Sequence, residues 1–344
     1  MGKKYYAVIA DHLTLPIDEG LKKMTFELMK FASSLENVDI YSSPDNIGVH
    51  GVTLYRSNKL MFSSEIRNIL HKRVYTDIIY IPNTSATFYS FIRSWLISLQ
   101  TSGEVLIHLI NSQERFLKSW QYKLVRLMEN VEVVSFSRSS SERYKKQNML
   151  TKVLPCGVDI DIFRPIADKE KLSLRKKYKF PLDKNIVLHV GHIRKSRNIS
   201  ILKELQVNGF QVIVVGSTSM AFEKELANEL SECGMIILSD YNPHVEELYQ
   251  LSDLYVFPVW LPDAAIEFPL SVLEAMACGI PVLTTRFGAL TDVFNESSCF
   301  GFFNNEYELL TKAKDLAGKD ASINREIIVE KYSWKSVMEK LFEE

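Results

Sequence analysis

The chain is predicted to form two α/β domains, each built on a doubly wound parallel sheet. Its 344 residues exceed the usual size of one domain, and 46% of them are hydrophobic, which suffices for a sizeable core in each half. Short apolar runs typical of buried strands alternate with helical segments along both halves. A connecting segment with two prolines and a glycine, 153–165, lies between the two series. We therefore place the domains at 1–155 and 156–325, followed by a terminal helical segment at 326–344.

The first half begins with an apolar run at 5–10 that is predicted to be a buried strand. A loop at 11–20 leads to a helix at about 21–35. The next segments alternate in the same way, which favours a doubly wound sheet. Strands are predicted at 38–41, 51–55, 77–82, 104–110 and 131–137, and helices at 83–100 and from Ser137 or Ser139 onward.

The second half repeats this order after a helix at 168–178. A last helix is predicted at 323–342. Strands are predicted at 186–191, 211–216, 235–238, 253–258 and 280–285, and the remaining helices at 220–233 and about 269–278.

The most informative stretch runs from Ala264 to Gly288 and is predicted to be a loop, a helix and a strand. Pro269 suits the first helical turn, and Gly279 suits the position after the helix, where positive φ is common. Glu274 lies inside this mostly apolar helix, so its carboxylate either meets hydrogen-bond donors of a neighbouring element or faces a ligand. Glu267 precedes it by seven residues, close to the same helical azimuth, so both carboxylates are expected to face one cleft. The helix N-terminus suits an anion, most simply a phosphate.

Four cationic or near-cationic residues follow the strand at 186–191. They are either solvated surface or an anion site, and their place between a strand and a helix favours the site. Gly216 ends the next strand, where a ligand can approach the backbone, and no GxGxxG fingerprint occurs in the chain. The four residues are His192, Arg194, Lys195 and Arg197.

The segment EFPLSVLEAMACGIPVLTT resembles the donor-binding segment of the GT-B, family-4-type retaining glycosyltransferases, the glycosyl transferases group 1. Residues 153–165 resemble the segment in which that family crosses between domains. The resemblance implies a GT-B fold, in which two Rossmann-like domains face a cleft and the second domain binds a nucleotide sugar. It also implies that the terminal helix crosses back onto the first domain.

The resemblance assigns Glu274 to the ribose of the nucleotide sugar. The first glutamate of the family motif falls at Ile266 here, so Glu267 is the candidate replacement, one position late. Arg197 and His192 fall where the family places the residues that contact the donor diphosphate. Glu267, Arg197 and His192 are therefore the expected catalytic residues. The other expected donor-binding residues are Gly20, Gly191, Arg194, Phe268, Pro269, Leu270, Ser271, Gly216, Tyr241 and Val245, and His108 is either an acceptor-side residue or a hydrogen-bonded core histidine.

The expected reaction, implied by the resemblance, is retaining transfer of a hexose from a nucleotide-diphosphate sugar to a glycan, lipid or protein-linked acceptor. The donor is a co-substrate, and neither a cofactor nor a metal ion is expected, because no Asp-x-Asp constellation follows a strand. Two alternatives stay open. A GT-B epimerase would turn over the donor alone, and a non-catalytic nucleotide-sugar binder, favoured by Ile266, would bind the donor without transfer.

The charge distribution and the cysteines limit the possible partners and the cellular compartment. Residues 1–165 hold 21 Lys and Arg against 16 Asp and Glu, whereas the remainder holds 20 against 26. The basic half suggests contact with something anionic, such as a membrane surface, although solvated surface charge explains it as well. Nucleic acid is not expected, since basic and aromatic residues do not interleave in a known module. Four unpaired cysteines, the absence of a leader-like start and the lack of a long apolar run favour the cytoplasm.

Overall fold

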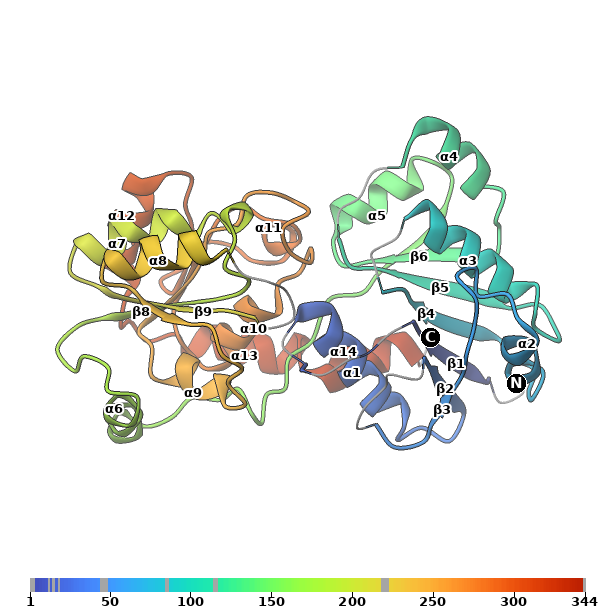
Figure 1. Cartoon of the computed structure of the whole chain (residues 1–344), viewed down its shortest axis with the longest axis horizontal. Helices are drawn as coiled ribbons and strands as arrows, with labels where there is room; N and C mark the ends of the chain where they lie inside the picture. The colour runs from blue at the N-terminus through green and yellow to red at the C-terminus, as the bar shows by residue number, and fades with distance from the viewer. Residues whose placement is uncertain are drawn as a thin grey trace.

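The computed structural model confirms two α/β domains that lie side by side (Figure 1). Each domain has a parallel sheet covered by helices on both faces. The structure describes residues 4–11, 13, 16–17, 19–43, 49–83, 87–113, 117–217 and 223–342. Within these residues no helix is both long enough and apolar enough to cross a membrane.

The first domain holds a seven-stranded sheet in the order β3-β2-β1-β4-β5-β6-β7. Helix α1, together with the last helix of the chain, covers one face, and α2 to α5 cover the other. The strands are β1 (Tyr6–Ala10), β2 (Val38–Ser42), β3 (Val52–Leu54), β4 (Asp77–Ile81), β5 (Leu106–Asn111), β6 (Val131–Ser135) and β7 (Leu150–Val153). The helices are α1 (Gly20–Ala32), α2 (Ser64–Leu70), α3 (Phe88–Ser98), α4 (Ser119–Val125) and α5 (Arg138–Lys145).

The second domain holds a six-stranded sheet in the order β10-β9-β8-β11-β12-β13. The strands are β8 (Ile186–Val190), β9 (Gln211–Val215), β10 (Ile236–Leu238), β11 (Leu254–Phe257), β12 (Val282–Thr284) and β13 (Phe300–Phe302). The helices are α6 (Asp168–Lys177), η1 (Lys195–Arg197), η2 (Ile199–Leu202), α7 (Lys203–Val207), α8 (Lys224–Glu232), α9 (Val245–Gln250), α10 (Leu270–Ala277), α11 (Leu290–Val293), α12 (Glu306–Leu316) and α13 (Ser322–Lys331). The last helix, α14 (Trp334–Phe342), returns to the first domain.

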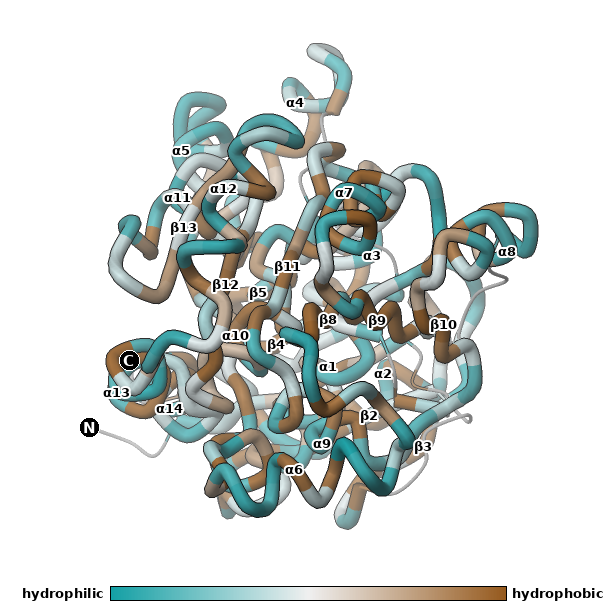
Figure 2. Tube along the Cα trace, turned by 90° about the vertical axis from the view of Figure 1, so that its left-hand side faces the viewer, coloured by the Kyte–Doolittle hydropathy of each residue, from teal (hydrophilic) through white to brown (hydrophobic). Residues whose placement is uncertain are grey.

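Side chains alternate between the two faces of each strand, so each sheet separates two hydrophobic layers. In β1, for example, Val8 belongs to the layer under α1, whereas Ile9 belongs to the layer under α2 to α5. Strands such as β9 run as hydrophobic segments through the interior, while outer helices such as α8 carry many hydrophilic residues (Figure 2). In both sheets the order reverses beside the first strand, β1 or β8, which places a ligand crevice at the carboxyl ends of these strands.

The chain crosses between the domains twice, and the two crossings lie side by side. Val158 in the first crossing donates its N–H to Tyr332 O at 2.8 Å, and the Trp334 N–H donates to Val158 O at 3.3 Å. Gly157 lies under Trp334, because a Cβ at this position would approach the ring atom Cε3 to 2.6 Å. Arg325 donates to two carbonyl groups of the first crossing. The hinge is therefore a short two-stranded contact rather than a single linker.

The prediction of one terminal helix at 323–342 is wrong. Two helices, α13 and α14, occupy this range, and they are separated at Tyr332 and Ser333, where the chain pairs with Val158. Helix α13 packs on α10 of the second domain, whereas α14 packs on α1 of the first. Phe342 near the end of α14 meets the ring of Tyr6 at 5.5 Å. The break lets one terminal segment contact both domains.

Several other elements were not predicted. Most are short, such as α2 and α4 with seven residues each and the edge strand β7, but α12 has eleven residues. Strand β7 lacks a buried face, so its sequence carries no clear alternation. The predicted starts of the helices at 83–100 and 220–233 fall partly outside the described residues, as does part of the loop at 11–20.

Candidate functional site

A cleft between the two domains consists of two adjoining pockets of about 330 and 290 Å³. The carboxyl ends of β8 and β9 and the start of α10 line it from the second domain, and α1 lines it from the first. This is the crevice that the strand order of the second sheet predicts. The pockets meet at six shared residues, which are Lys23, Val190, Gly191, Ser217, Leu270 and Glu274.

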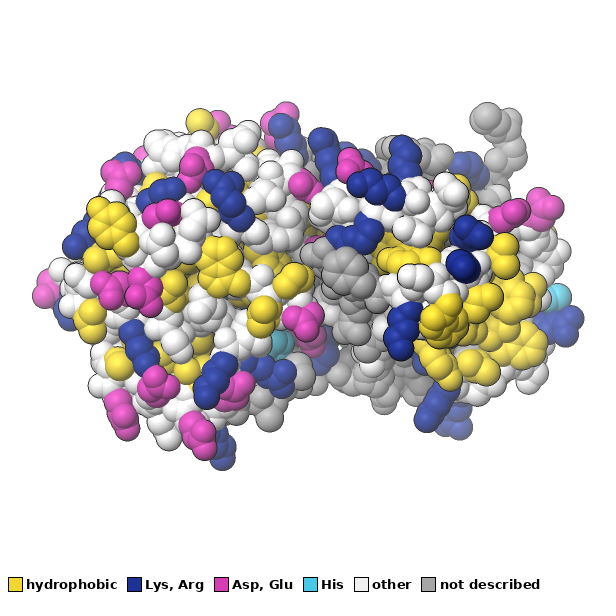
Figure 3. Space-filling view, turned by 90° about the horizontal axis from the view of Figure 1, so that it is seen from above, with side chains coloured by type: hydrophobic (Ala, Val, Ile, Leu, Met, Phe, Trp, Pro, Cys, Tyr) yellow, Lys and Arg dark blue, Asp and Glu magenta, His cyan; other side chains and the backbone are white. Residues whose placement is uncertain are grey.

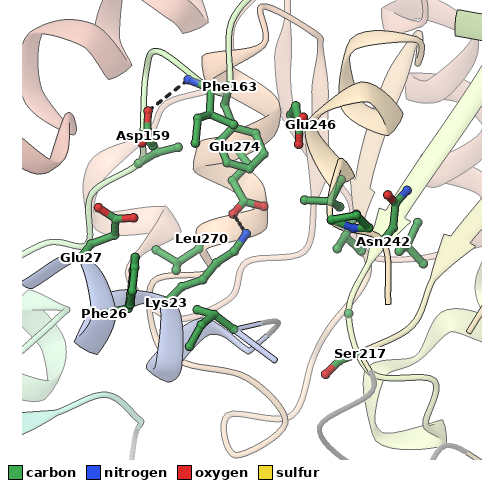
Figure 4. Close-up of a pocket in the computed structure, with 18 of the residues that line it drawn as sticks. Lys23, Phe26, Glu27, Asp159, Phe163, Ser217, Asn242, Glu246, Leu270 and Glu274 are labelled. Atoms are coloured by element: carbon green, nitrogen blue, oxygen red, sulfur yellow. Dashed lines mark hydrogen bonds and ion pairs between the residues drawn. The ribbon is translucent and has the colours of Figure 1, made fainter. Parts of the chain in front are cut away.

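Glu274 lies where the two pockets meet. Its carboxylate is almost fully buried, with Oε1 at 2.5 Å from Lys23 Nζ and Oε2 accepting a hydrogen bond from Tyr249 at 2.7 Å. Burial, together with the charge of Glu274, raises the pKa of Tyr249 well above its usual range, so this hydroxyl stays a donor. Figure 4 shows Glu274 and Lys23 pointing toward each other, with Asn242 and Glu246 across the cavity. Glu274 thus accepts a hydrogen bond from a buried side chain and also lines the cleft, so both alternatives that its sequence context left open apply.

Lys23 was missed in the sequence. It comes from α1 of the first domain and also lies over the ring of Phe163, with its ammonium 5.1 Å from the ring centre. Only its position in the first turns of a helix, directly after the predicted loop at 11–20, hinted at a role. It brings a positive charge from the first domain to a carboxylate of the second.

The second pocket, which we call the cationic pocket after the loop that follows β8, also has the carboxylates of Glu19, Asp263 and Glu274 in its lining. Arg197, His192 and Arg194 all line it, as their position after β8 predicted. Burial lowers the pKa of Arg197 to about 10, so the guanidinium stays charged at neutral pH, and it forms no ion pair with any residue that the structure describes. Gly191 leaves room for it, since a Cβ there would lie 3.2 Å from Arg197 Nη1 and from His189 Nε2. A partly buried cation that forms no ion pair with the described residues suits an anionic ligand.

Most of the other predicted donor-binding residues do line the cleft. The predicted residues that line the cationic pocket are Gly20, Gly191, Pro269, Leu270 and Ser271, three of them at the start of α10. Those that line the less polar pocket are Gly191, Gly216, Tyr241, Val245 and Leu270. Gly279 has φ +68° after α10, as expected for a helix end.

Phe268 differs from the expectation. Its side chain is fully buried and packs edge-on against Tyr332 at 5.5 Å and near Phe294 at 6.1 Å, so it lines neither pocket. Its role is to anchor the loop before α10 onto the hydrophobic layer at the hinge.

The expectation that Glu267 faces the same cleft as Glu274 is wrong. Glu267 is 2% exposed and accepts hydrogen bonds from Ser137 Oγ at 3.0 Å and from Ser140 Oγ, at the N-terminus of α5 in the first domain. Asp292 adds a second carboxylate at the same helix end, accepting from Arg138 N at 2.9 Å. Glu267 is therefore an interdomain contact, stabilised by the helix N-terminus, and not a residue of the cleft.

Ile266 takes the place beside the cleft instead. It lines the cationic pocket, and a Cβ on Gly20 would approach its Cδ1 to 2.8 Å. Gly20 begins α1, so the missing side chain lets the first domain close against the loop before α10. The glycine serves packing between the domains as well as the cleft that it lines.

His108 does not lie at the ligand edge of its sheet, which corrects its predicted place near the carboxyl end of the strand. It lies in the first half of β5, with Nδ1 2.8 Å from Glu132 and Nε2 3.0 Å from Asp77. Both carboxylates belong to the amino ends of the neighbouring strands β6 and β4. Burial opposes protonation, but these hydrogen bonds outweigh it and raise the pKa of His108. The core-histidine alternative is the one the structure supports.

Solved structures define the class of this fold. A glycosyltransferase from Rickettsia africae superposes with a TM-score of 0.77 at 19% identity, covering 99% of this chain and 98% of that one. HepE from Anabaena in complex with UDP gives 0.77 at 16% identity, covering 98% of both chains. The chain therefore has the GT-B fold.

The family signature lies in the second domain. Residues 170–332 match the family model of the glycosyl transferases group 1, which confirms the resemblance seen in the motif around Glu274. The D-inositol 3-phosphate glycosyltransferase of Mycolicibacterium paratuberculosis is 32% identical over 144 residues, which are 39% of this chain and 31% of that protein. The chain thus aligns with about a third of the length of the curated relatives it matches.

Proposed function

We propose that this protein is a glycosyltransferase that moves a hexose from a nucleotide-diphosphate sugar to an acceptor. The observation that carries the proposal is the buried carboxylate of Glu274 at the junction of a less polar and a cationic pocket. A nucleotide sugar has the matching sequence of parts, since its ribose hydroxyls lie between a flat base and a charged diphosphate. HepE, which shares the fold, was solved with UDP-glucose, which supports a donor of this class.

In this proposal the base occupies the pocket beside Tyr241 and Val245, and the ribose hydroxyls donate to Glu274. The diphosphate lies at the start of α10, where backbone N–H groups and the helix dipole favour an anion. Arg197 and His192 stabilise the charge that grows on the leaving phosphate as the bond to the sugar breaks. Arg197 provides a planar, permanently charged fork for this purpose.

The proposal extends to the stereochemistry and to the metal requirement. We propose that the configuration at the anomeric carbon is retained, with the leaving phosphate accepting the proton of the acceptor hydroxyl, as the resemblance implies. We also propose that transfer needs no metal ion, because Arg194, Arg197 and His192 already face the diphosphate position. Addition of a chelator should then leave the rate unchanged.

The acceptor, a glycan or a lipid-linked or protein-linked group, would lie against the first domain. We place the protein in the cytoplasm because Cys156, Cys233, Cys278 and Cys299 are all free thiols. The basic excess of the first half supports peripheral contact with a membrane.

A second candidate function, a non-catalytic nucleotide-sugar binder, is favoured by one observation. The position of the first motif glutamate is Ile266, and the neighbouring Glu267 is held by Ser137 and Ser140, so neither position presents a motif carboxylate to the sugar. Such a protein would bind the donor but neither transfer nor hydrolyse the sugar.

A panel of UDP-, GDP- and ADP-sugars tests both candidates. A donor that binds the native state raises the free energy of unfolding by about 2.7 kcal/mol at a hundredfold excess over Kd, and so raises the unfolding midpoint. The stabilising donor is then incubated alone and with candidate acceptors, and the products are separated by chromatography. Release of nucleotide supports a transferase, an epimerised donor indicates an epimerase, and binding with an unchanged donor indicates the binder. A panel in which no sugar nucleotide raises the midpoint would refute all three.

A further inference from the structure

Helix α3 is apolar on both sides. Its buried side faces the sheet through residues such as Phe91 and Ile97, as expected for a helix in this layer. Its outer side is also apolar, with Tyr89 55%, Trp95 39% and Leu99 57% exposed. Trp95 and Leu99 lie four positions apart and form one stripe, whereas Tyr89 lies six positions before Trp95, about 120° around the helix, at the edge of the same outer side.

Helix α4 continues this stripe. Trp120, Leu124 and Leu127 follow one another at helical spacing and are 52%, 46% and 71% exposed. The two helices lie side by side, and the ring of Phe88 meets that of Trp120 at 5.2 Å. We call the outer sides of both helices the α3–α4 face. It includes Tyr89, Trp95, Leu99, Trp120, Leu124 and Leu127.

The charged side chains on and beside α4 are basic. Helices α3 and α4 contain no Asp or Glu, and Lys118, Lys123 and Arg126 are exposed on or beside α4, whereas exposed Glu104 and Glu129 lie a few residues beyond the two helices. Seen from above, the first domain shows a broad hydrophobic area with Lys and Arg side chains at its edges (Figure 3). Exposed apolar area of this extent marks an interaction site, because monomeric proteins rarely leave it in water.

We propose that the α3–α4 face docks the protein on an anionic lipid bilayer. The combination of exposed tryptophans, long aliphatic side chains and lysine or arginine suits the bilayer interface, where rings lie at headgroup depth and cations meet anionic lipid. A protein partner of this face would need acidic groups around an apolar centre. The bilayer is favoured because the apolar residues extend over two neighbouring helices and present two tryptophans beside the cations.

Docking in this way leaves the cleft accessible. None of the residues lining the two cleft pockets comes from α3 or α4. The contact is peripheral, since it uses the surfaces of short helices that pack on the sheet with their other sides. The inference rests on the peripheral membrane contact proposed above and names the surface that makes it, but it does not depend on the proposed transfer reaction.

Vesicle cosedimentation of the full chain tests the proposal. Vesicles of phosphatidylcholine with about 30% phosphatidylglycerol are compared with pure phosphatidylcholine at low and at high salt. One variant pair, Lys123→Glu with Arg126→Glu, reverses the charge, and another, Trp120→Ser with Leu124→Ser, removes apolar contact. Matched controls on exposed second-domain helices are Lys176→Glu with Lys314→Glu, and Leu172→Ser with Tyr307→Ser.

We expect the protein to bind the anionic vesicles, to be released by salt, and to lose at least tenfold in partition with either α3–α4 variant but not with the controls. The unfolding midpoint checks that each variant is folded, and its increase with a nucleotide sugar should be unchanged, which separates this proposal from the proposed function. Failure of the wild-type chain to bind anionic vesicles overturns it. So does equal loss in the controls. A concentration-dependent dimer that Trp120→Ser with Leu124→Ser dissolves, without vesicle binding, would assign the face to a second copy of the chain instead.

Discussion

Replacing Glu274 with alanine should weaken donor binding and folding by separate routes. In the free protein the carboxylate is paired with Lys23 at 2.5 Å and Tyr249 at 2.7 Å. If the ribose hydroxyls bind the same carboxylate, its removal costs roughly 1–3 kcal/mol of donor affinity, the value of hydrogen bonds to a charged group. That corresponds to a Kd raised about 5- to 150-fold. Isothermal calorimetry with the stabilising nucleotide sugar measures it directly.

The folding effect needs its own control, because the same substitution leaves the buried Tyr249 hydroxyl without its acceptor. That loss costs about 1–3 kcal/mol of unfolding free energy. Tyr249→Phe removes the hydroxyl while the carboxylate and Lys23 stay in place, and Tyr249 lines neither pocket. We expect Tyr249→Phe to leave the donor Kd within about twofold of the wild type, well below the change predicted for Glu274→Ala. An unchanged Kd for Glu274→Ala, or an equal loss of affinity in Tyr249→Phe, would refute the assignment of Glu274 to the donor.

Arg197→Ala should lower the transfer rate more than donor affinity, because the guanidinium stabilises the leaving phosphate most strongly in the transition state. Equal losses of kcat and of donor affinity would contradict this. The hydrogen bonds of His108 to two carboxylates raise its pKa above 6.5, so its stabilising effect is complete below 6.5 and is lost as pH rises through the raised value. The melting temperature should therefore fall as the pH rises above 6.5 in the wild type and fall less in His108→Gln, and parallel curves for the two proteins would show that His108 does not cause the change. Gly157→Ala forces a Cβ to 2.6 Å from Trp334 and should cost roughly 1–3 kcal/mol, whereas Gly103→Ala meets only the end of a side chain and should be nearly neutral by chemical denaturation.

Local chemistry made the strands and the motif helix predictable. Strand β8 is a continuous apolar run, α10 begins after Pro269, and Gly279 follows its end with positive φ. Each of these signals depends on residues within a few positions of one another, where periodicity and backbone preference are strong. The cationic loop after β8 was found in the same way, because the carboxyl end of a strand in such a sheet is a known place for ligands.

The errors came from contacts between distant residues. Helical periodicity placed Glu267 and Glu274 at the same azimuth, but α10 begins only at Leu270, so the helix rotation does not apply to Glu267. Its partner Ser137 lies 130 positions away, and Lys23 lies 251 positions from Glu274. Spacing along the chain contains no information on such pairs.

By itself, the sequence determined the two α/β domains, the helix that carries Glu274 and the cations that follow β8, since short-range hydrophobic pattern and backbone chemistry dictate them. Only the tertiary structure decided which carboxylate faces the cleft and which one holds the domains together. It also decided where the terminal helix breaks, at the point where Val158 pairs with the returning chain. These outcomes depend on how the two domains pack against each other, and domain packing fixes side-chain partners that no local pattern specifies.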